Sequence, residues 1–147
     1  MLRQTLLSLH LLGAAVWTGG HLVLALTVLP RAMRARDAKI VHEFEEGFEK
    51  LGIPALLVQI VTGVWMALQW MPSPARWFDL QNPIARGVLV KLTLLAVTAV
   101  LALHARLRVL PQLTDDRLGV LAAHIIPVTI LSVLFVLAGV AFRFGGL

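Results

Sequence analysis

The sequence predicts an all-α fold, an integral membrane four-helix bundle, and three observations support this prediction. Only 14% of the residues are charged, whereas a soluble domain carries about 25%. The mean hydropathy is +0.85, and apolar residues gather in stretches long enough to cross a bilayer as helices. A chain of 147 residues has room for four such spans and little else. We therefore predict a single transmembrane domain over residues 1–147, with spans at about 6–30, 51–71, 87–108 and 118–142.

The first predicted span, from Leu6 to Pro30, contains no charged residue but carries two histidines. It is too long for the apolar core of a signal peptide and lacks an A-x-A cleavage site, so we interpret it as a retained helix. The spacing of His10 and His21 brings both side chains to within about 20° of one helix face, about 16 Å apart along the axis. Trp17 shares this face. Because lipid offers an imidazole no hydrogen-bond partner, the face is expected to point into the protein.

The connector after the first span, residues 31–50, is charged and alternates in sign. Phe44 and Phe48 recur there at helical spacing, so we expect an amphipathic helical turn or two before the second span. A second side of these turns is either a solvated face or a surface patch that loads a metal ion. That side carries His42, Glu45, Glu46 and Glu49.

The third span follows a connector rich in proline and aromatic residues, which we expect to be an ordered loop at the membrane surface. Lys91 near the start of this span either extends toward the lipid headgroups or holds a carboxylate of a porphyrin or substrate. His104 is the one strongly polar group deep on its inner face. Asp115 or Asp116 is expected to cap the fourth span, and His124 lies in the second turn of that span.

Charge distribution predicts how the bundle is oriented. An even number of spans places both termini on one side of the membrane, where we count five Lys and Arg residues against eight on the other side. The positive-inside rule then favours a multi-pass protein of a bacterial-type inner (plasma) membrane, with both termini on the non-cytoplasmic side. The net charge of +5 indicates contact with membrane lipid headgroups rather than with nucleic acid. The absence of cysteine excludes disulfides and thiolate metal ligands.

Three histidines from three spans lie at a similar depth. From the rise of a helix, His21, His104 and His124 lie about 13, 9 and 10 Å inside the cytoplasmic-side ends of their spans. Two of them could be the axial ligands of a b-type haem (heme b), with glycines making room for the ring and the third bonding a propionate or a ligand. Arg106 or Arg108 would pair with the propionates. The glycines concerned are Gly13, Gly19, Gly20, Gly63 and Gly139.

We favour this haem interpretation, with His21 and one of the other two as ligands, in electron transfer or redox chemistry with a redox partner or quinone-like small molecule. If His10 also binds haem, it forms a second and more open site. An alternative is a copper site made by the same imidazoles, with ions relayed to His10 and the methionines. In a third interpretation, each histidine separately hydrogen-bonds a neighbouring helix. Trp17, Lys91 and Arg106 complete the predicted cofactor site, while no catalytic residue is assigned and activity as a membrane oxidoreductase is left open.

Several of these motifs resemble the first span of the CopD copper-resistance family. His10 is followed by Trp17 and by Gly19-Gly20, and the span closes on Leu29-Pro30. The same span, with Arg31 after Pro30, is similar to that of the related HemJ membrane protoporphyrinogen oxidases. The likeness covers most of the chain, and its further elements are Phe48-Glu49-Lys50-Leu51, Pro54, Gly63, Lys91-Leu92, His104 and Pro127-Val128-Thr129.

The resemblance implies a four-helix membrane unit that handles haem, porphyrin or copper. In HemJ-like proteins a first-span histidine and a third-span lysine form the functional pair, which corresponds here to His10 and Lys91. Where those proteins carry an Asn-Glu pair, this chain has Ala123-His124, and His21 is additional. Both differences favour a bound metal or haem. Because CopD proteins usually have eight spans, the resemblance also implies that a four-span copper importer forms a homodimer. A non-catalytic alternative is that the chain is a subunit of a larger complex.

Overall fold

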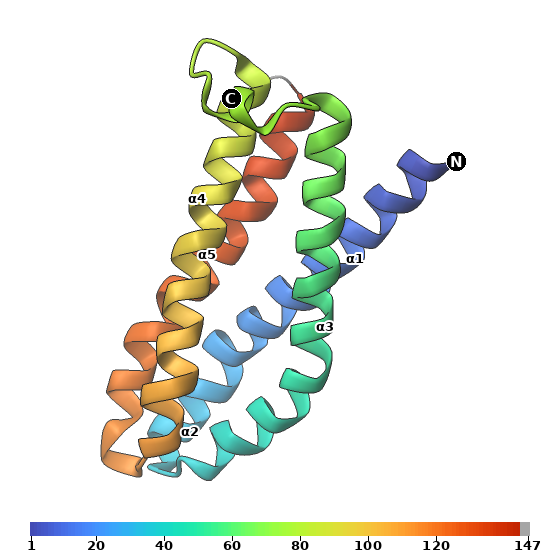
Figure 1. Ribbon diagram of the computed structural model, residues 1–147. Helices are drawn as coiled ribbons and strands as arrows, with labels where there is room; N and C mark the ends of the chain where they lie inside the picture. Colours follow the sequence, from blue (N-terminus) through green and yellow to red (C-terminus); the bar gives the residue numbers. More distant parts are fainter. Residues whose placement is uncertain (145–147) are drawn as a thin grey trace.

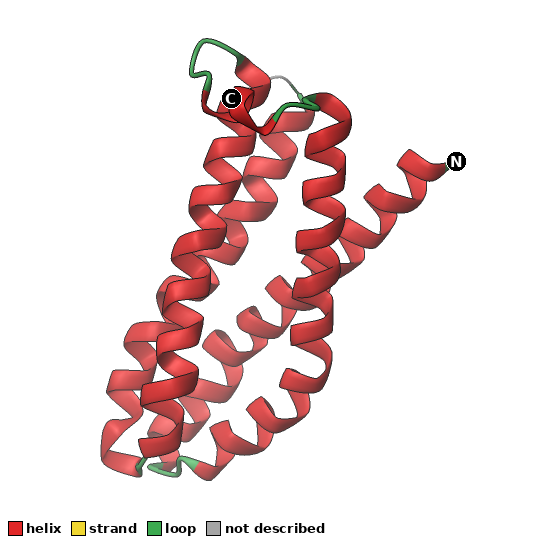
Figure 2. Cartoon of the chain, viewed as in Figure 1, coloured by secondary structure: helices red, strands yellow, loops and turns green. Residues whose placement is uncertain are grey.

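Four long helical segments make up the computed structural model, which describes residues 1–144. These residues contain no β-strand, and their loops lie only at the ends of the helical segments (Figure 2). Each segment is long and apolar enough to cross a membrane, which confirms the predicted all-α membrane bundle. In chain order the segments are Leu2–Ala35, Lys39–Trp70, Pro83–Gln112 and Asp115–Arg143.

The first segment combines α1 (Leu2–Val23), a π-helical turn η1 (Leu24–Val28) and α2 (Leu29–Ala35). Pro30 lies inside this continuous segment, directly after η1, and the wider turn of η1 accommodates a residue that has no backbone N–H. The segment ends at Arg36, whose φ of 52° is left-handed and stops the helix. The predicted first span is therefore one helical segment that extends beyond the predicted end at Pro30.

The second segment is one helix, α3 (Lys39–Trp70), which begins well before the predicted start of the span near residue 51. The amphipathic part of the connector continues directly into the span because its aromatic side packs inward. Phe44 and Phe48 stack with ring centroids 5.7 Å apart. At the start of α3, the backbone N–H of Lys39 donates to Asp37 Oδ1 at 2.9 Å.

Asp115 caps α3 rather than the fourth span. The backbone N–H of Ala38 donates to Asp115 Oδ1 at 2.8 Å. Asp115 itself lies in the 3-10 turn η5 (Asp115–Arg117), and α5 (Leu118–Arg143) follows with no side-chain hydrogen bond at its N-cap. The prediction that Asp115 or Asp116 caps the fourth span is therefore wrong. The fold brings the start of α3 beside η5, and the unpaired N–H groups of that helix start attract the carboxylate.

The third segment starts with α4 (Pro83–His104), and Asn82 caps it by accepting hydrogen bonds from two backbone N–H groups at 2.9 and 3.4 Å. A second π-helical turn, η3 (Ala105–Val109), and a 3-10 turn, η4 (Leu110–Gln112), continue it. The predicted third span ends near residue 108, within η3. His104 therefore lies where regular α-helix gives way to a wider turn.

The connector between α3 and α4 is ordered, as the sequence predicts. It contains the 3-10 turn η2 (Pro74–Phe78), where the buried Trp77 donates from Nε1 to the carbonyl oxygen of Met71 at 3.0 Å. Met71 and Trp77 pack with Ala85 and Val88 in a small apolar cluster. This cluster fixes how α4 leaves the connector.

The N-terminus, the end of α5 at Arg143 and the α3–α4 connector lie at one end of the bundle, which we call the terminal end (Figure 1). The other two connectors lie at the opposite end. In the bundle α1 packs mainly against α3 and α5, while α4 packs against α5. The main apolar core lies at the opposite end and includes Leu24, Leu29, Ala32, Val41, Leu121 and Ile125. This packing decides which polar side chains meet.

Two of the glycines expected to make room for a haem ring are sites of close packing between α1 and α3. A methyl group on Gly13 would lie 2.8 Å from the backbone oxygen of Ala55, and one on Gly20 would overlap the ring of Phe48. Small residues let membrane helices approach closely, and these two glycines do so here. The expected space for a ring is thus already filled at these two positions.

We expect Gly20→Ala to destabilise the protein by about 1–3 kcal/mol, because the new methyl group overpacks the interface against Phe48. Gly19→Ala is the matched control, since no atom outside its own helix lies within 4 Å of the added methyl group. The control should be neutral or slightly stabilising, because alanine is the better helix former. Thermal unfolding of both variants in detergent, followed by circular dichroism, measures the difference, and equal midpoints would show that Phe48 moves aside without cost.

Candidate functional site

At the opposite end of the bundle, α4 and α5 bring two histidines into direct contact. His104 is the last residue of α4, and His124 lies in the second turn of α5. His104 Nδ1 and His124 Nε2 are 2.8 Å apart and form a hydrogen bond. The two rings are nearly parallel, with an interplanar angle of 14° and centroids 4.9 Å apart. We call these two residues the histidine pair.

The backbone determines which nitrogen of the histidine pair carries each proton. His124 Nδ1 lies 3.0 Å from the carbonyl oxygen of Val120, which can only accept, so Nδ1 donates. In a neutral imidazole the other nitrogen is then a lone pair, so His124 Nε2 accepts the Nδ1–H of His104. His104 Nε2 is consequently also a lone pair. The pair is a directed chain of hydrogen bonds that ends on the exposed His104 side chain.

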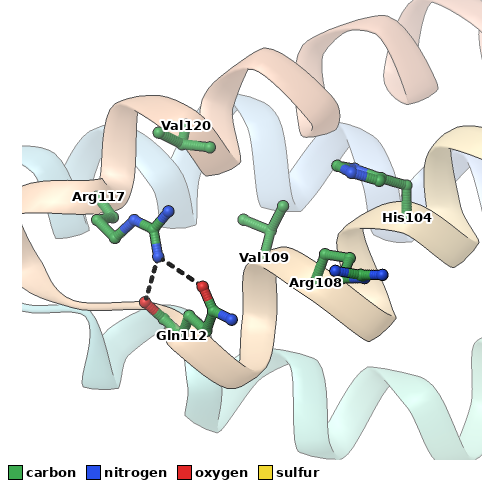
Figure 3. Close-up of a pocket in the computed structure, with 6 residues that line it drawn as sticks. All are labelled: His104, Arg108, Val109, Gln112, Arg117 and Val120. Atoms are coloured by element: carbon green, nitrogen blue, oxygen red, sulfur yellow. Dashed lines mark hydrogen bonds between the residues drawn. The ribbon is translucent and has the colours of Figure 1, made fainter.

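His104 also lines an open pocket of about 390 Å³ beside the histidine pair (Figure 3). The pocket lies where η3 and η4 meet the start of α5. π-helical turns of the η3 kind are frequent at functional sites, because they displace side chains from regular helical positions. The other lining residues are Arg108, Val109, Gln112, Arg117 and Val120, all labelled in Figure 3.

His21, the expected first ligand of a haem, has other partners. Its Nδ1 donates to the carbonyl oxygen of Trp17 at 2.9 Å, one helical turn earlier. The His21 ring lies 4.4 Å from the Trp17 ring and 5.6 Å from the Phe48 ring, measured between centroids. Both His21 and Trp17 are only 8% exposed. The predicted inward-facing stripe of α1 is confirmed for these two residues.

The structure brings two of the three deep histidines together, not all three. Within residues 1–144 no group of three or more His, Cys, Asp or Glu side chains is arranged to hold a metal ion. Equal depth did not imply contact, because depth says nothing of the rotation of each helix about its axis. His21 faces Phe48 of α3, whereas His124 faces α4.

His10 lies against α3 near the terminal end. Its Nδ1 is 3.0 Å from the hydroxyl oxygen of Thr62. That hydroxyl donates its own proton to the carbonyl oxygen of Val58 at 2.6 Å, so the oxygen accepts from His10. A methyl group on Gly63 would lie 3.0 Å from the His10 ring. His10 therefore hydrogen-bonds a neighbouring helix, α3, as the third interpretation of the histidines predicts.

Lys91 lies on α4, and its half-buried side chain packs against α5. Its ammonium nitrogen is 5.2 Å from the centroid of the Phe142 ring, a cation–π contact. The same nitrogen lies 3.9 Å from where a methyl group on Gly139 would be. His10 and Lys91 each lie in the third turn of a helix that begins at the terminal end, α1 and α4 respectively.

Arg106, an expected partner of haem propionates, forms an ion pair with a carboxylate of α3. Its Nη1 lies 2.6 Å from Glu49 Oε2. The two side chains are 52% and 30% exposed, so the pair contributes little stability, about 0–1 kcal/mol. It does connect η3 to α3 beside the histidine pair. Arg108, the other expected partner, lines the pocket instead.

Sequence reasoning missed Arg117, Gln112 and Val120 as parts of the site. A signal was present in the helical spacing, since His104, Arg108 and Gln112 recur every four residues along one helix face. Arg117 was counted only as a loop charge in the prediction of orientation. Its contact with Gln112 depends on the turn between η4 and η5, which spacing alone does not define.

One protein family matches the part of the chain that contains most of this site. The family described as copper resistance protein D matches residues 42–142, which include the histidine pair and Lys91. His10 and His21 lie outside the matched range. Comparisons with curated proteins and with solved structures found no match.

We expect both members of the histidine pair to carry their proton on Nδ1 at neutral pH, because Val120 accepts from one and His124 from the other. Nitrogen NMR of protein labelled at histidine distinguishes protonated from unprotonated ring nitrogens. His124→Ala assigns the signals and should also release the His104 proton from its hydrogen bond. A proton on Nε2 of His124 would contradict the direction of the chain.

Proposed function

The chain belongs to the copper resistance protein D family, and on this premise we propose that it binds copper ions through His104 and His124. It is a copper-resistance-type multi-pass membrane protein. The observation that carries the proposal is the direct contact between the two imidazoles, at 2.8 Å. Imidazole nitrogen is a donor that suits copper, and this chain has no cysteine to offer instead.

The proton arrangement of the pair is compatible with a metal ion between the rings. A bond from a metal ion to an imidazole nitrogen is about 2 Å long, so His104 Nδ1 and His124 Nε2 would separate to about 4 Å. His104 Nδ1 would lose its proton, and the exposed Nε2 of the same ring can carry it. The ring changes tautomer and stays neutral. The π-helical turn η3, directly after His104, is a place where the helix can absorb a small movement.

Two nitrogen donors form a modest site. Structural metal sites usually have four protein ligands, and the described residues offer no third His, Asp or Glu beside the pair. Arg108 near His104 further disfavours a cation. Both features suit an ion that is passed on, as cargo, better than one that is retained. We further propose that the pair faces the cytoplasm of a bacterial-type inner membrane and that two copies associate.

The haem alternative has weaker support from the side chains present. Gly13 and Gly20 are packed against α3, and His21 is enclosed by two aromatic rings. Arg106 is engaged with Glu49. Axial ligation by two imidazoles would also need the ring of a macrocycle between His104 and His124, where the nitrogens are in contact. Electron transfer to a quinone-like partner depends on haem and remains a prediction from the sequence.

We expect the detergent-purified protein, expressed with copper and haem both in supply, to contain copper and to show no haem absorption band. His104→Ala and His124→Ala should each lower copper affinity more than about tenfold, because each removes a direct ligand. His21→Ala, which removes an imidazole that is enclosed by Trp17 and Phe48 outside the pair, is the matched control and should retain copper. Metal analysis and an absorption spectrum of one sample measure both quantities. If the reduced protein instead shows the absorption band of a b-type haem, and His104→Ala loses this band, the ligand of the histidine pair is haem and not copper.

A second function has one specific observation in its favour, the position of His10 and Lys91 in the third turns of two helices that both begin at the terminal end. In HemJ-like proteins the corresponding residues form the functional pair of a protoporphyrinogen oxidase. The Lys91 ammonium, which has no carboxylate partner among the described residues, can hold the carboxylate of a porphyrin. The histidine pair would have no role in this second function.

This second function predicts that the chain restores growth of cells that lack protoporphyrinogen oxidase. Lys91→Ala should abolish the rescue, because it removes the charge at the terminal end. Lys39→Ala, which removes an exposed lysine at the opposite end, is the matched control and should rescue fully. Growth without added haem is the measurement. Rescue by the Lys91→Ala variant, or none by the unaltered chain, would exclude this function.

A further inference from the structure

The pocket beside the histidine pair is positively charged and has no acidic wall. Two arginines, Arg108 and Arg117, are among its lining residues, and no Asp or Glu is among them. Val120, which is 45% exposed, gives the pocket an apolar edge. A pocket of about 390 Å³ with this lining is suited to an anion rather than to a metal cation.

Arg117 is held in a fixed orientation by a residue of the neighbouring turn. Its Nη1 donates to Gln112 Oε1 at 2.9 Å and to the Gln112 backbone oxygen at 3.5 Å, as the dashed lines in Figure 3 show. A guanidinium has five N–H donors, so those on Nε and Nη2 remain for a ligand. Because Gln112 is neutral, it orients Arg117 without cancelling its charge. This contact favours one orientation of the guanidinium before any ligand arrives.

Arg108 has a charge that the described part of the chain does not neutralise. The ion pair found within residues 1–144 joins Arg106 to Glu49 and leaves Arg108 unpaired. Arg108 lies one helical turn after His104, on the same side of the pocket (Figure 3). Arg108 and Arg117 both line the open pocket, and a guanidinium offers paired N–H donors that suit the oxygen atoms of a phosphate group.

From this arrangement we propose that Arg108 and Arg117 form a binding site for a phosphate group. The pocket lies where the segment Pro83–Gln112 ends and the segment Asp115–Arg143 begins. Because both segments are long enough to cross a bilayer, their ends are expected near a membrane surface. Basic pockets between membrane helices at that level bind the headgroups of anionic phospholipids. A soluble phosphate offers the same chemistry. The apolar edge at Val120 favours the lipid, whose acyl chains continue into the bilayer.

This site is separate from the proposed copper function, although His104 borders both. Its two arginines are not copper ligands, and a phosphate site with no copper bound at the histidine pair would leave the inference intact. Measuring the copper content of the arginine variants distinguishes a failure of the phosphate site from a failure of the copper site.

The test is a titration of delipidated protein in detergent with phosphatidylglycerol, with phosphatidylcholine and with inorganic phosphate. Native mass spectrometry counts bound lipid, and calorimetry measures phosphate. Phosphatidylglycerol should bind more tightly than phosphatidylcholine, and Arg108→Gln with Arg117→Gln should weaken it about tenfold or more for each arginine. Arg34→Gln with Arg36→Gln is the matched control, because it removes two exposed charges at the same end outside the pocket.

The outcomes separate the sources of the phosphate. Weakening of phosphatidylglycerol binding in the pocket variant alone supports a lipid headgroup, and the same effect on inorganic phosphate supports a soluble ligand. Equal loss in the pocket and control variants would overturn the proposal, because it would report general charge. If the double variant loses its helical circular dichroism, Arg108→Gln alone takes its place. Equal binding of the two lipids by the unaltered chain, without phosphate binding, would also overturn the proposal.

Discussion

The hydrogen bonding of imidazoles inside a membrane is the constraint on which this structure depends. Lipid offers these rings no partner, so every histidine in the spans must find one within the protein. Each of the four uses its Nδ1 for this purpose, toward Thr62, toward two backbone carbonyls, and within the histidine pair. These hydrogen bonds occupy the Nδ1 atom of each ring. The Nε2 atoms and the contact between His104 and His124 remain for ligand binding.

Helix packing decides which of these histidines meet. Close approach of α1 to α3 at Gly13 and Gly20 directs His10 and His21 toward α3. The contact between α4 and α5 brings His104 and His124 together instead. Polar groups therefore gather in two places, with an imidazole and an ammonium near the terminal end and the histidine pair with its arginines at the opposite end. A copper function and an oxidase function would draw on different ends of the bundle.

At the opposite end, the histidine pair and the arginine pocket lie side by side but suit ligands of opposite charge. Glu49 pairs with Arg106 and Asp115 with the start of α3, and no Asp or Glu lines the pocket of Arg108 and Arg117. A cation between the histidines and an anion in the pocket would lie close together and attract one another. The π-helical turn η3 connects the two places, because it carries Arg108 and follows His104 directly.

The sequence by itself determined the class of this protein, because long uncharged stretches have one stable arrangement in a bilayer, the helix. It also identified the inner face of α1 and the histidines that must be partnered, since periodicity and polarity are local properties. It could not determine the rotation of each helix, so three histidines at one depth became a pair and a separate, enclosed residue. Nor could it show that Asp115 reaches α3 or that Arg117 joins Gln112. Those contacts depend on turns and on glycine-mediated approach between segments distant in the sequence, and only the tertiary structure decides them.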